Sequence, residues 1–528
     1  MSASILFRHT ERGGSPDPPR TNRPRGTSAR RVRRPAALGL VAVVLVAVLA
    51  ARAPAAEESV DVAGRWSRGR IWQWYNAQPW LVGCNFVPST ACNDVEMWQK
   101  ETFDPETIDR ELGWAAGLGF NTVRVFVNYV VWEADADGLK RRMTKFLEMA
   151  DRHGIRTMFI LFDDCFKPEP KVGKQDAPVP GVHNSQWVQS PGARRRDNAD
   201  HWPMLEKYVK DVVGAFGQDN RVVFWDLYNE PSKSPALVEA AFKWARAARP
   251  SQPLTSCWLG VDYSDILSFH CYGDLAAVRA EIDKLTPNRR GRPYLCTEWM
   301  ARRGGSRFET HLPYLKQQNI GCWSWGLVAG RTQTYFAWGS KPGDPEPDPW
   351  FHDLLRKDGQ PQIYEEARAI KAATGKLLPR EVLIPTAEKA SLTWRYTIEK
   401  PGDDWFKPAF DDAGWRECPA PFGTPDARIG RSPRTLWTSE DIWLRREFEL
   451  TGSPRDAALL MHHDEDTEVY INGRLATKVS AYNAAYEEFE ITTEAKAALH
   501  QGKNLLAVHT HQTIGGQYID VGIVSDAK

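Results

Sequence analysis

Eight short apolar runs, separated by stretches with helical periodicity, constrain the fold of this 528-residue chain more than any other feature. They lie between Trp80 and Thr374 and read WLVGCNF, NTVRVFV, TMFILF, VVFWDLY, LTSCW, ILSFHC, YLCTEW and GCWSWG. Uninterrupted apolar strands that alternate with helices indicate a parallel sheet covered on both faces. Eight such units in roughly 300 residues favour a closed α/β barrel, of the (β/α)8 type, over an open sheet.

Helix signals fall between these runs, as a barrel requires. Asp104, Pro105 and Glu106 supply a cap, a first-turn proline and a first-turn acid for a helix over IDRELGWAAGLG. The segment LKRRMTKFLEMADRHG predicts a second helix. Further helices are expected to begin near Pro203, Pro235, Asp274 and Ile363.

The pattern changes after Lys376. From Leu392 onward apolar and polar residues alternate in SLTWRYTIE, IWLRREFEL, TEVYINGRLATKV, YEEFEIT, NLLAVHTHQ and YIDVGIV, and turn signals such as Asn472-Gly473 separate the runs. Alternation indicates strands with one buried face and one exposed face. We therefore expect a barrel domain over residues 60–378 and an all-β antiparallel sandwich over residues 388–528.

The N-terminal segment predicts export. Residues 1–34 are rich in Pro, Gly, Ser and Arg, and the apolar stretch 36–51 is shorter than the roughly 20 residues of a membrane-spanning helix. Ala53 and Ala55 offer a cleavage site. We expect residues 1–55 to be a disordered tail with an export signal, and the protein to be secreted or held in the cell envelope or periplasm. An uncleaved anchor helix is the alternative, and it is the one membrane contact expected.

Charge and composition narrow the class of partner. The chain has 68 basic and 67 acidic residues, so bulk charge favours neither nucleic acid nor a membrane surface. Its 22 Trp residues suit sugar rings, which have apolar faces, although core packing accounts for part of them. The eight Cys residues have no metal-ligand spacing, and Cys84 with Cys92 is the one local candidate for a disulfide.

Two glutamates lie at the ends of predicted barrel strands. Glu230 follows the fourth run and Glu298 lies in the seventh. The carboxyl ends of parallel barrel strands open at one mouth, so both side chains should reach the same site. In retaining glycoside hydrolysis one carboxyl group protonates the leaving oxygen and another, about 5 to 5.5 Å away, attacks the anomeric carbon.

These two carboxyl groups need different environments. We expect partial desolvation beside Trp225 and Tyr228 to keep Glu230 protonated. Hydrogen bonds and a cation should keep Glu298 ionised, and Arg124 in the second run is the candidate cation. A purely structural ion pair is the alternative for Arg124.

The same residues resemble the catalytic residues of retaining glycoside hydrolases of clan A, namely the cellulase-like family five and the TIM barrel of family two. The likeness covers about Trp80 to Thr374. It is carried by Asn229-Glu230-Pro231 and Glu298, by Arg124 in NTVRVFV, by His270 and Tyr272 in FHCYG, and by Trp325 in GCWSWG.

The resemblance implies a role for each matching residue. Glu230 would be the acid/base and Glu298 the nucleophile, while Arg124 and Tyr272 would hydrogen-bond the nucleophile. Asn229 would hold the sugar's 2-hydroxyl, and Trp325 would form the floor under the ring being cleaved. His270 would also contact the substrate, with a satisfied core histidine as its alternative. No metal or organic cofactor is required.

The third run departs from the family pattern. LFDDCF places Asp163 and Asp164 at the mouth, where family five members often carry a histidine. These acids would either contact sugar or order the loop. The following segment, Cys165 to Asp200, is far longer than a usual barrel connection and should wall the substrate cleft, with Trp187 as a ring contact. A merely decorative surface loop is the alternative.

The main hypothesis is a retaining glycosidase acting on β-linked polysaccharides or oligosaccharides such as mannan or glucan. One alternative is a non-catalytic carbohydrate-binding protein, and another is a metal-dependent hydrolase using Asp163, Asp164 and His270. The C-terminal sandwich resembles, more loosely, the galactose-binding-like jelly rolls attached to family two enzymes, through FDDAGWRECPAPFG, WLRREFEL and VYINGRLA. It would bind glycan or buttress the barrel.

Overall fold

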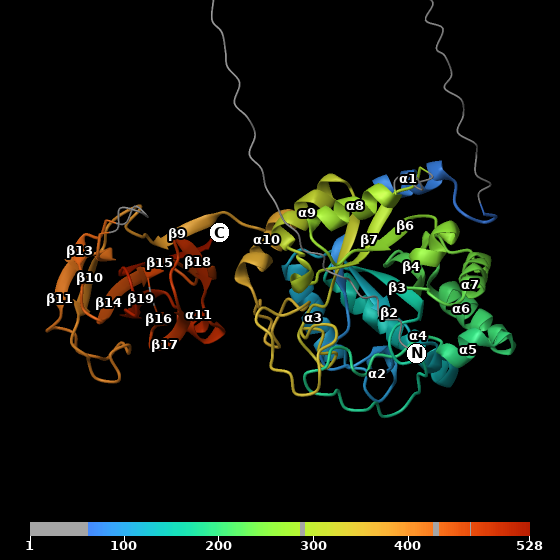
Figure 1. The fold of residues 1–528 in the computed structure, drawn as a ribbon, viewed down its shortest axis with the longest axis horizontal. Coiled ribbons are helices and arrows are strands. Elements are labelled where there is room, and N and C mark those ends of the chain that lie inside the picture. Colours follow the sequence, from blue (N-terminus) through green and yellow to red (C-terminus); the bar gives the residue numbers. More distant parts are fainter. Residues whose placement is uncertain (1–61, 286–290, 426–431, 465, 528) are drawn as a thin grey trace, which may run out of the picture. The chain divides into compact units, whose positions relative to one another are not determined.

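The computed structural model describes residues 62–285, 291–425, 432–464 and 466–527 (Figure 1). The predicted export signal, residues 1–55, lies outside these ranges. Within them, no helix combines the length and the apolar character needed to cross a membrane.

Eight parallel strands form a barrel in the order β5-β4-β3-β2-β1-β8-β7-β6. Each contains residues of one of the eight apolar runs, so the predicted (β/α)8 TIM barrel is confirmed. The strands are β1 (Val82–Asn85), β2 (Thr122–Phe126), β3 (Arg156–Asp163), β4 (Val222–Asn229), β5 (Leu254–Thr255), β6 (Leu267–His270), β7 (Tyr294–Trp299) and β8 (Gly321–Trp325).

The strands β5 and β6 lie at the two ends of this order, and individual hydrogen bonds join β5 to the residues just before β6. The Asp265 amide donates to the Leu254 carbonyl over 2.8 Å. The Thr255 hydroxyl donates to the Ile266 carbonyl over 2.8 Å. The strand β5 is short because the chain turns at once into a 3-10 helix, Trp258–Tyr263, where the sequence predicts a longer strand.

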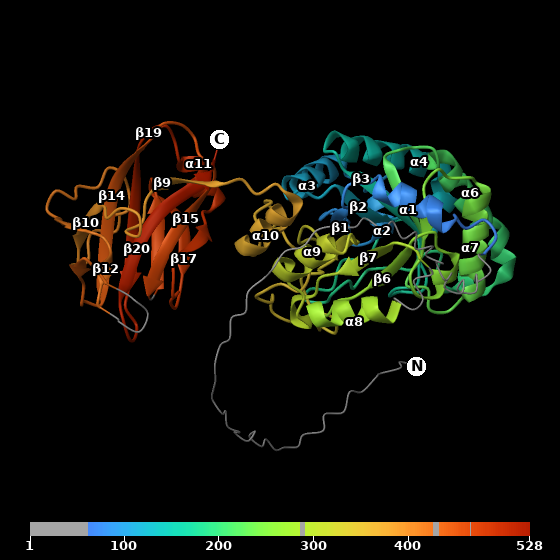
Figure 2. The ribbon, with the colours of Figure 1, turned by 90° about the horizontal axis from the view of Figure 1, so that it is seen from above.

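Helices surround the ring of strands (Figures 1 and 2). All the helices predicted from sequence are present. The sequence does not predict α9, because Pro313 lies inside it and interrupts the helical pattern. The helices are α1 (Arg68–Asn76), α2 (Asp94–Trp98), α3 (Pro105–Gly117), α4 (Tyr129–Arg152), α5 (Ala193–Asp197), α6 (Trp202–Phe216), α7 (Pro235–Ala247), α8 (Leu275–Leu285), α9 (Phe308–Gln317) and α10 (Tyr364–Thr374).

One end of the barrel is closed by apolar side chains. Ile71 and Tyr75 of α1 belong to the same buried cluster as Met158, Phe224 and Trp323 of the strands. Most of these strand residues lie toward the amino-terminal ends of their strands. The opposite, carboxyl-terminal mouth therefore remains as the place for a site, as is usual in this architecture.

The chain after Pro379 forms two six-stranded sheets that share one core, which confirms the predicted sandwich. Their pairs are antiparallel, except that β12 and β13 run parallel. The first sheet has the order β11-β10-β14-β19-β16-β17, and the second has the order β13-β12-β20-β15-β18 with β9 beside β20.

The strand bounds and the order of the elements are as follows. The first sheet contains β10 (Thr393–Thr397), β11 (Arg416–Pro419), β14 (Asp441–Leu450), β16 (Asp466–Ile471), β17 (Arg474–Val479) and β19 (Gly502–His511). The second contains β9 (Arg380–Ile384), β12 (Phe422–Gly423), β13 (Thr435–Leu436), β15 (Arg455–Asp464), β18 (Glu487–Glu490) and β20 (Tyr518–Asp526), and α11 (Thr493–Ala498) lies between β18 and β19.

The sequence does not predict β15, because RDAALLMHHD lacks alternation. In the structure most of this strand is buried on both faces. The turn at Asn472-Gly473 is confirmed, since both residues have positive φ, 48° and 80°, between β16 and β17. The exact domain limits, 60–378 and 388–528, stay a prediction.

All eight cysteines are free. The suggested disulfide between Cys84 and Cys92 is therefore wrong for this structure. Both side chains are fully buried, and Cys84 packs in the core between barrel and helices.

Candidate active site

Glu230 and Glu298 meet at the carboxyl-terminal mouth of the barrel. Glu230 directly follows β4, and Glu298 lies near the end of β7. One carboxylate oxygen of each glutamate and one ring nitrogen of His270 all lie within 4.8 Å of one another. This spacing is compatible with the separation of about 5 to 5.5 Å that a covalent sugar intermediate requires.

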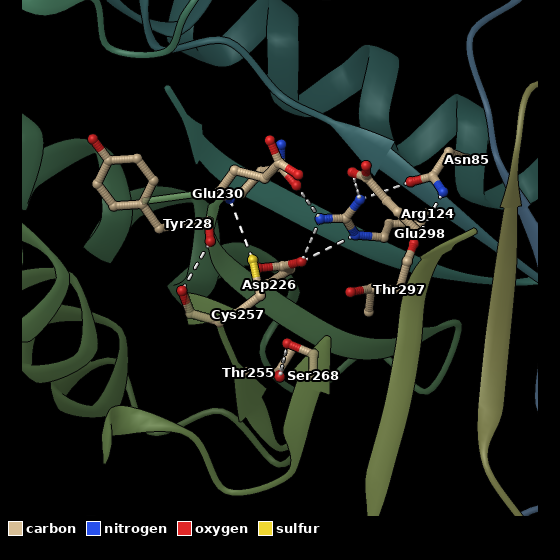
Figure 3. Close-up of polar contacts among 12 residues, drawn as sticks. Asn85, Arg124, Asp226, Tyr228, Glu230, Thr255, Cys257, Ser268, Thr297 and Glu298 are labelled. Atoms are coloured by element: carbon tan, nitrogen blue, oxygen red, sulfur yellow. Dashed lines mark hydrogen bonds and ion pairs between the residues drawn. The ribbon is translucent and has the colours of Figure 1, made fainter. Parts of the chain in front are cut away.

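Arg124 and Tyr272 hold the Glu298 carboxylate. The Arg124 Nη1 donates to Oε1 over 2.7 Å, and the Tyr272 hydroxyl donates to Oε2 over 2.6 Å. Figure 3 shows the guanidinium of Arg124 between Glu298 and Asp226. Two donors therefore fix the position of the Glu298 carboxylate at the mouth.

Arg124 is itself fixed by buried acceptors. Asp226 Oδ2 accepts from both Nε and Nη2, over 3.0 and 2.7 Å, and Asn85 Oδ1 accepts from Nη1 over 2.7 Å. Burial alone would lower the pKa of Arg124, but the charges of Asp226 and Glu298 raise it above its usual value. Arg124 therefore stays charged. It forms ion pairs with Glu298, the candidate nucleophile, and with Asp226.

His270 lies between the two candidate catalytic glutamates. Its Nδ1 is 2.7 Å from Glu230 Oε1 and 3.4 Å from Glu298 Oε2. Burial would lower the pKa of His270, but the charge of Glu298, the Cys257 thiol and the Glu230 hydrogen bond raise it well above its usual value. The surrounding groups therefore favour the protonated form of His270.

The pKa of Glu230 differs from the sequence-based expectation. Burial acts to raise it, but the hydrogen bond and charge of His270 outweigh burial, so the pKa lies below its usual value. Trp225 and Tyr228 donate hydrogen bonds to Gln252 and Asp164. The opposite directions of the pKa shifts of Glu230 and His270 favour the shared proton on His270.

The backbone at Glu230 is unusual. Its φ is 46°, in the left-handed region that side-chain-bearing residues rarely adopt. Its amide donates to the Cys257 sulfur over 3.3 Å, and the Cys165 sulfur donates to its Oε2 over 3.3 Å. These contacts hold the carboxyl group at the mouth.

Asp163 positions other site residues and does not line the cavity. Its Oδ1 accepts from the Asn229 amide over 2.9 Å, and its Oδ2 accepts from the Trp187 ring nitrogen over 2.8 Å. Asn229 also accepts from Arg124 Nη2 over 2.7 Å. Burial raises the pKa of Asp163 to about 7, against the opposing effect of its hydrogen bonds.

Asp164 orders the long insertion. It accepts from Arg196 Nη1 and from the Tyr228 hydroxyl, each over 2.8 Å, and from the Ser232 amide over 3.0 Å. Its side chain is buried away from the cavity. Neither Asp163 nor Asp164 is in the lining of the cavity described below.

A cavity of about 240 Å³ lies above the glutamates and includes Asn229 and Tyr272 in its lining. Phe126, Trp187 and Trp325 form an aromatic cluster on it, with ring centroids 4.9 to 6.1 Å apart and edge-on contacts. The predicted ring contacts, Trp187 and Trp325, are thus brought together. Trp323 lies two residues before Trp325 in β8, and its side chain packs in the apolar cluster that α1 closes, away from the mouth.

Sequence reasoning did not identify several residues of the site. His183, Trp338 and His352 line the cavity from loops without periodicity. Asp226 lies within the fourth apolar run, and an acid in the middle of VVFWDLY was a signal that could have indicated it. A larger groove of about 870 Å³ beside α4 contains none of these residues.

Glu230, His270 and Glu298 form the one set of three convergent metal-ligand side chains found within the described ranges. His270 and Glu230 already hydrogen-bond each other, and the Glu298 carboxylate accepts hydrogen bonds from Arg124 and Tyr272. The alternative metal set of Asp163, Asp164 and His270 is not brought together.

No family model and no curated protein matches the sequence. The solved structures that are similar to this chain include the following three. GH5_18 from Streptomyces cattleya in complex with GlcNAc is 13% identical, with TM-score 0.40, covering 56% of this chain and 80% of that one. An exo-beta-1,4-mannosidase from Opitutaceae bacterium strain TAV5 is 17% identical, with TM-score 0.40, covering 57% and 61%. A family 5 mannosidase from Rhizomucor miehei is 13% identical, with TM-score 0.39, covering 57% and 94%.

Proposed function

We propose that the protein is a retaining glycoside hydrolase that cleaves β-linked polysaccharides or oligosaccharides, such as mannan or glucan, by double displacement. One observation carries this proposal. A carboxylate held by Arg124 and Tyr272 faces, within 4.8 Å, a second carboxyl group that is hydrogen-bonded to His270. We also propose that the chain is exported, as its N-terminal sequence predicts.

In the first step, an oxygen of Glu298 attacks the anomeric carbon and the bond to the leaving oxygen breaks. The leaving oxygen takes its proton from Glu230. Glu230 obtains that proton from His270, which donates through Nδ1 to Oε1 over 2.7 Å. A bound sugar excludes water from the cavity and disfavours separated charges, so it shifts the shared proton toward Glu230.

In the second step, Glu230 acts as the base. The ester at Glu298 carries no charge, so His270 loses the charge that contributes most to its raised pKa and stays neutral. Glu230 then removes a proton from water, whose oxygen attacks the anomeric carbon and releases Glu298. Two displacements on opposite faces retain the anomeric configuration.

A substrate screen tests the proposal. The full chain is incubated with aryl β-glycosides and with β-linked glucan and mannan oligomers, and the first anomer formed is identified by proton NMR. We expect the β anomer and at least about a 10⁴-fold loss of kcat in Glu298→Gln, by analogy with other nucleophile deletions. Glu230→Gln is the matched acid variant.

Two results would contradict the proposal. An α anomer as first product would exclude double displacement. Binding of oligosaccharides without turnover of any β-glycoside, unchanged in Glu298→Gln, would favour the non-catalytic carbohydrate-binding protein instead.

A further inference from the structure

Two loops close one side of the cavity. They are the insertion after β3 and the segment between β8 and α10, residues 326–363. Hydrogen bonds join them, including four of 2.8 to 3.0 Å, of which three involve the stretch from Val179 to Gly181. The bonds run from Asn184 N to Thr332 O, from Gly343 N to Pro180 O, from Gly181 N to Gln333 Oε1, and from Gln333 Nε2 to Val179 O.

This wall presents two neutral histidines to the cavity. His183 Nδ1 donates to the Phe336 carbonyl over 2.7 Å, and His352 Nδ1 donates to the Met300 carbonyl. A carbonyl only accepts, so each Nδ1 carries the hydrogen and each Nε2 offers a lone pair. Neither Nε2 has a hydrogen-bond partner in the part of the chain that the structure describes. The ring centroids are 5.4 Å apart.

The surroundings favour the neutral state of both rings. Burial lowers the pKa of His183 to about 4, with the Phe336 carbonyl opposing. Burial and the neighbouring His183 hold the pKa of His352 well below its usual value. Trp338 lies edge-on to Tyr272 at 4.9 Å and 5.6 Å from His352, so it forms the outer rim of this wall.

Under the proposed function, the side of the cavity that holds Glu230 and His270 is the leaving-group side. A general acid must lie beside the leaving oxygen, and Glu230 and His270 belong to β4 and β6. Trp258 lies next to them, with its ring centroid 6.1 Å from that of His270, and 49% of it is exposed. It directly follows Cys257, whose sulfur accepts from the Glu230 amide. Its φ of 49° marks a constrained backbone at a site of function.

The size of the cavity limits what can occupy it. About 240 Å³ lies below the roughly 300 to 1,000 Å³ of sites for drug-sized ligands. One sugar ring against Phe126, Trp187 and Trp325 fills such a space. A second ring on the far side of the first would meet the wall of His183 and His352.

We propose, on the premise of the proposed function, that the cavity accepts only the non-reducing terminal sugar of its substrate. The Nε2 atoms of His183 and His352 accept hydrogen bonds from hydroxyls of that sugar. The protein therefore removes one sugar at a time from chain ends, while the rest of the chain leaves past Trp258.

A product analysis tests the mode of cleavage. The full chain is given borohydride-reduced β-1,4-linked hexasaccharides of glucose and of mannose, and products are separated at low conversion. We expect the monosaccharide and the reduced pentasaccharide as the first products. Glu298-dependent release of internal fragments from the start would overturn this inference and leave the proposed function intact. Absence of hydrolysis of every β-glycoside would overturn both.

A matched pair of variants tests the two histidines. His352→Asn keeps a donor for the Met300 carbonyl but removes the cavity-facing nitrogen, whereas His352→Gln restores a polar group there. We expect kcat/KM to fall about tenfold in the first, mainly through KM, and less in the second. We expect the same results for His183→Asn and His183→Gln. The melting temperature of each variant is the control for correct folding.

Monodeoxy aryl glycosides give a readout on the unmodified protein. For the wild type, removing at least one hydroxyl from the substrate should lower kcat/KM about tenfold. Removing the same hydroxyl should have little effect on kcat/KM of His352→Asn or of His183→Asn. Equal rates for the parent and every deoxy substrate, or wild-type kinetics in both Asn variants, would overturn the hydrogen-bonding assignment.

Discussion

The two sides of one small cavity use the same side chain in opposite states. On the leaving-group side, His270 Nδ1 faces the carboxylates of Glu230 and Glu298, and its pKa is raised. On the closed side, His183 and His352 face backbone carbonyls, and their pKa values are lowered. All three rings are buried, so burial does not distinguish them.

The direction of each pKa shift follows the charges around the ring: the charge of Glu298 raises the pKa of His270, whereas burial lowers the pKa of His183 and His352 beside backbone carbonyls. A carboxylate compensates the desolvation of an imidazolium, whereas a carbonyl dipole does not compensate it fully. The charged groups His270, Glu230 and Glu298 thus lie where the proposed mechanism transfers a proton. Neutral acceptors are left where a sugar hydroxyl would be held.

Removing Arg124 should have the largest effect on the charged side. Arg124→Met leaves Asp226 and Glu298 buried without their cation, which should lower the free energy of unfolding by about 3 to 5 kcal/mol. Activity should fall by about 10² or more, because Glu298 loses a positioned donor. Urea denaturation and kcat/KM measure the two effects.

Arg124→Lys is the control, because it keeps the charge but cannot bond Asp226 and Glu298 with a planar fork. Its stability should lie between those of the wild type and Arg124→Met. Wild-type stability in the Met variant would show that the charged side does not depend on this network.

His270→Asn should shift the alkaline limb of the pH–activity profile toward lower pH, by about one unit or more. In the wild type the shared proton is lost only as pH rises through the raised pKa of His270. In the variant Glu230 holds the proton alone, and a buried carboxyl group loses it at lower pH. An unshifted limb would show that His270 does not supply the proton.

The neutral histidines should make stability fall in acid. A histidine with a lowered folded pKa contributes stability above its unfolded pKa of about 6.5, and this is lost as pH falls toward the folded value. For His183 that window extends from pH 6.5 to about 4. Between these values the wild type should lose up to about 3 kcal/mol more than His183→Asn, measured by denaturant unfolding. Parallel curves would show that His183 is not neutral in the fold.

Trp258→Ala should have the smallest effect, and it tests whether Trp258 belongs to the leaving-group side of the cavity. Loss of a ring contact on the leaving-group side should lower kcat/KM about tenfold for disaccharides. Glycosyl fluorides have no sugar on that side and should be hydrolysed as by the wild type. Equal losses for both substrates would place Trp258 on the closed side or in the fold alone.

The barrel was predictable because its signals are local. Apolar runs, caps such as Asp104 and prolines at helix starts each depend on a few neighbouring residues. Glu230 and Glu298 were predictable for the same reason, since a strand end in this architecture fixes where a side chain goes. The helix α9 and the strand β15 lack such local signals.

The closed wall was not predictable, because it exists only through contacts between distant loops. His183 and His352 are 169 positions apart and gain their roles from bonds to Phe336 and Met300. The same holds for the pKa of Glu230. The sequence placed aromatic residues beside Glu230, whereas the fold placed His270 there.

The left-handed backbone of Glu230 has a consequence for the history of this chain. A glutamate at φ 46° is less stable than glycine there, by about 1 kcal/mol or more, so the proposed catalytic role would be retained against a gain in stability. A lineage released from selection for turnover should drift to glycine or asparagine at this position before its barrel core changes. The residue at position 230 in a related protein would then indicate whether that protein has kept an enzymatic activity.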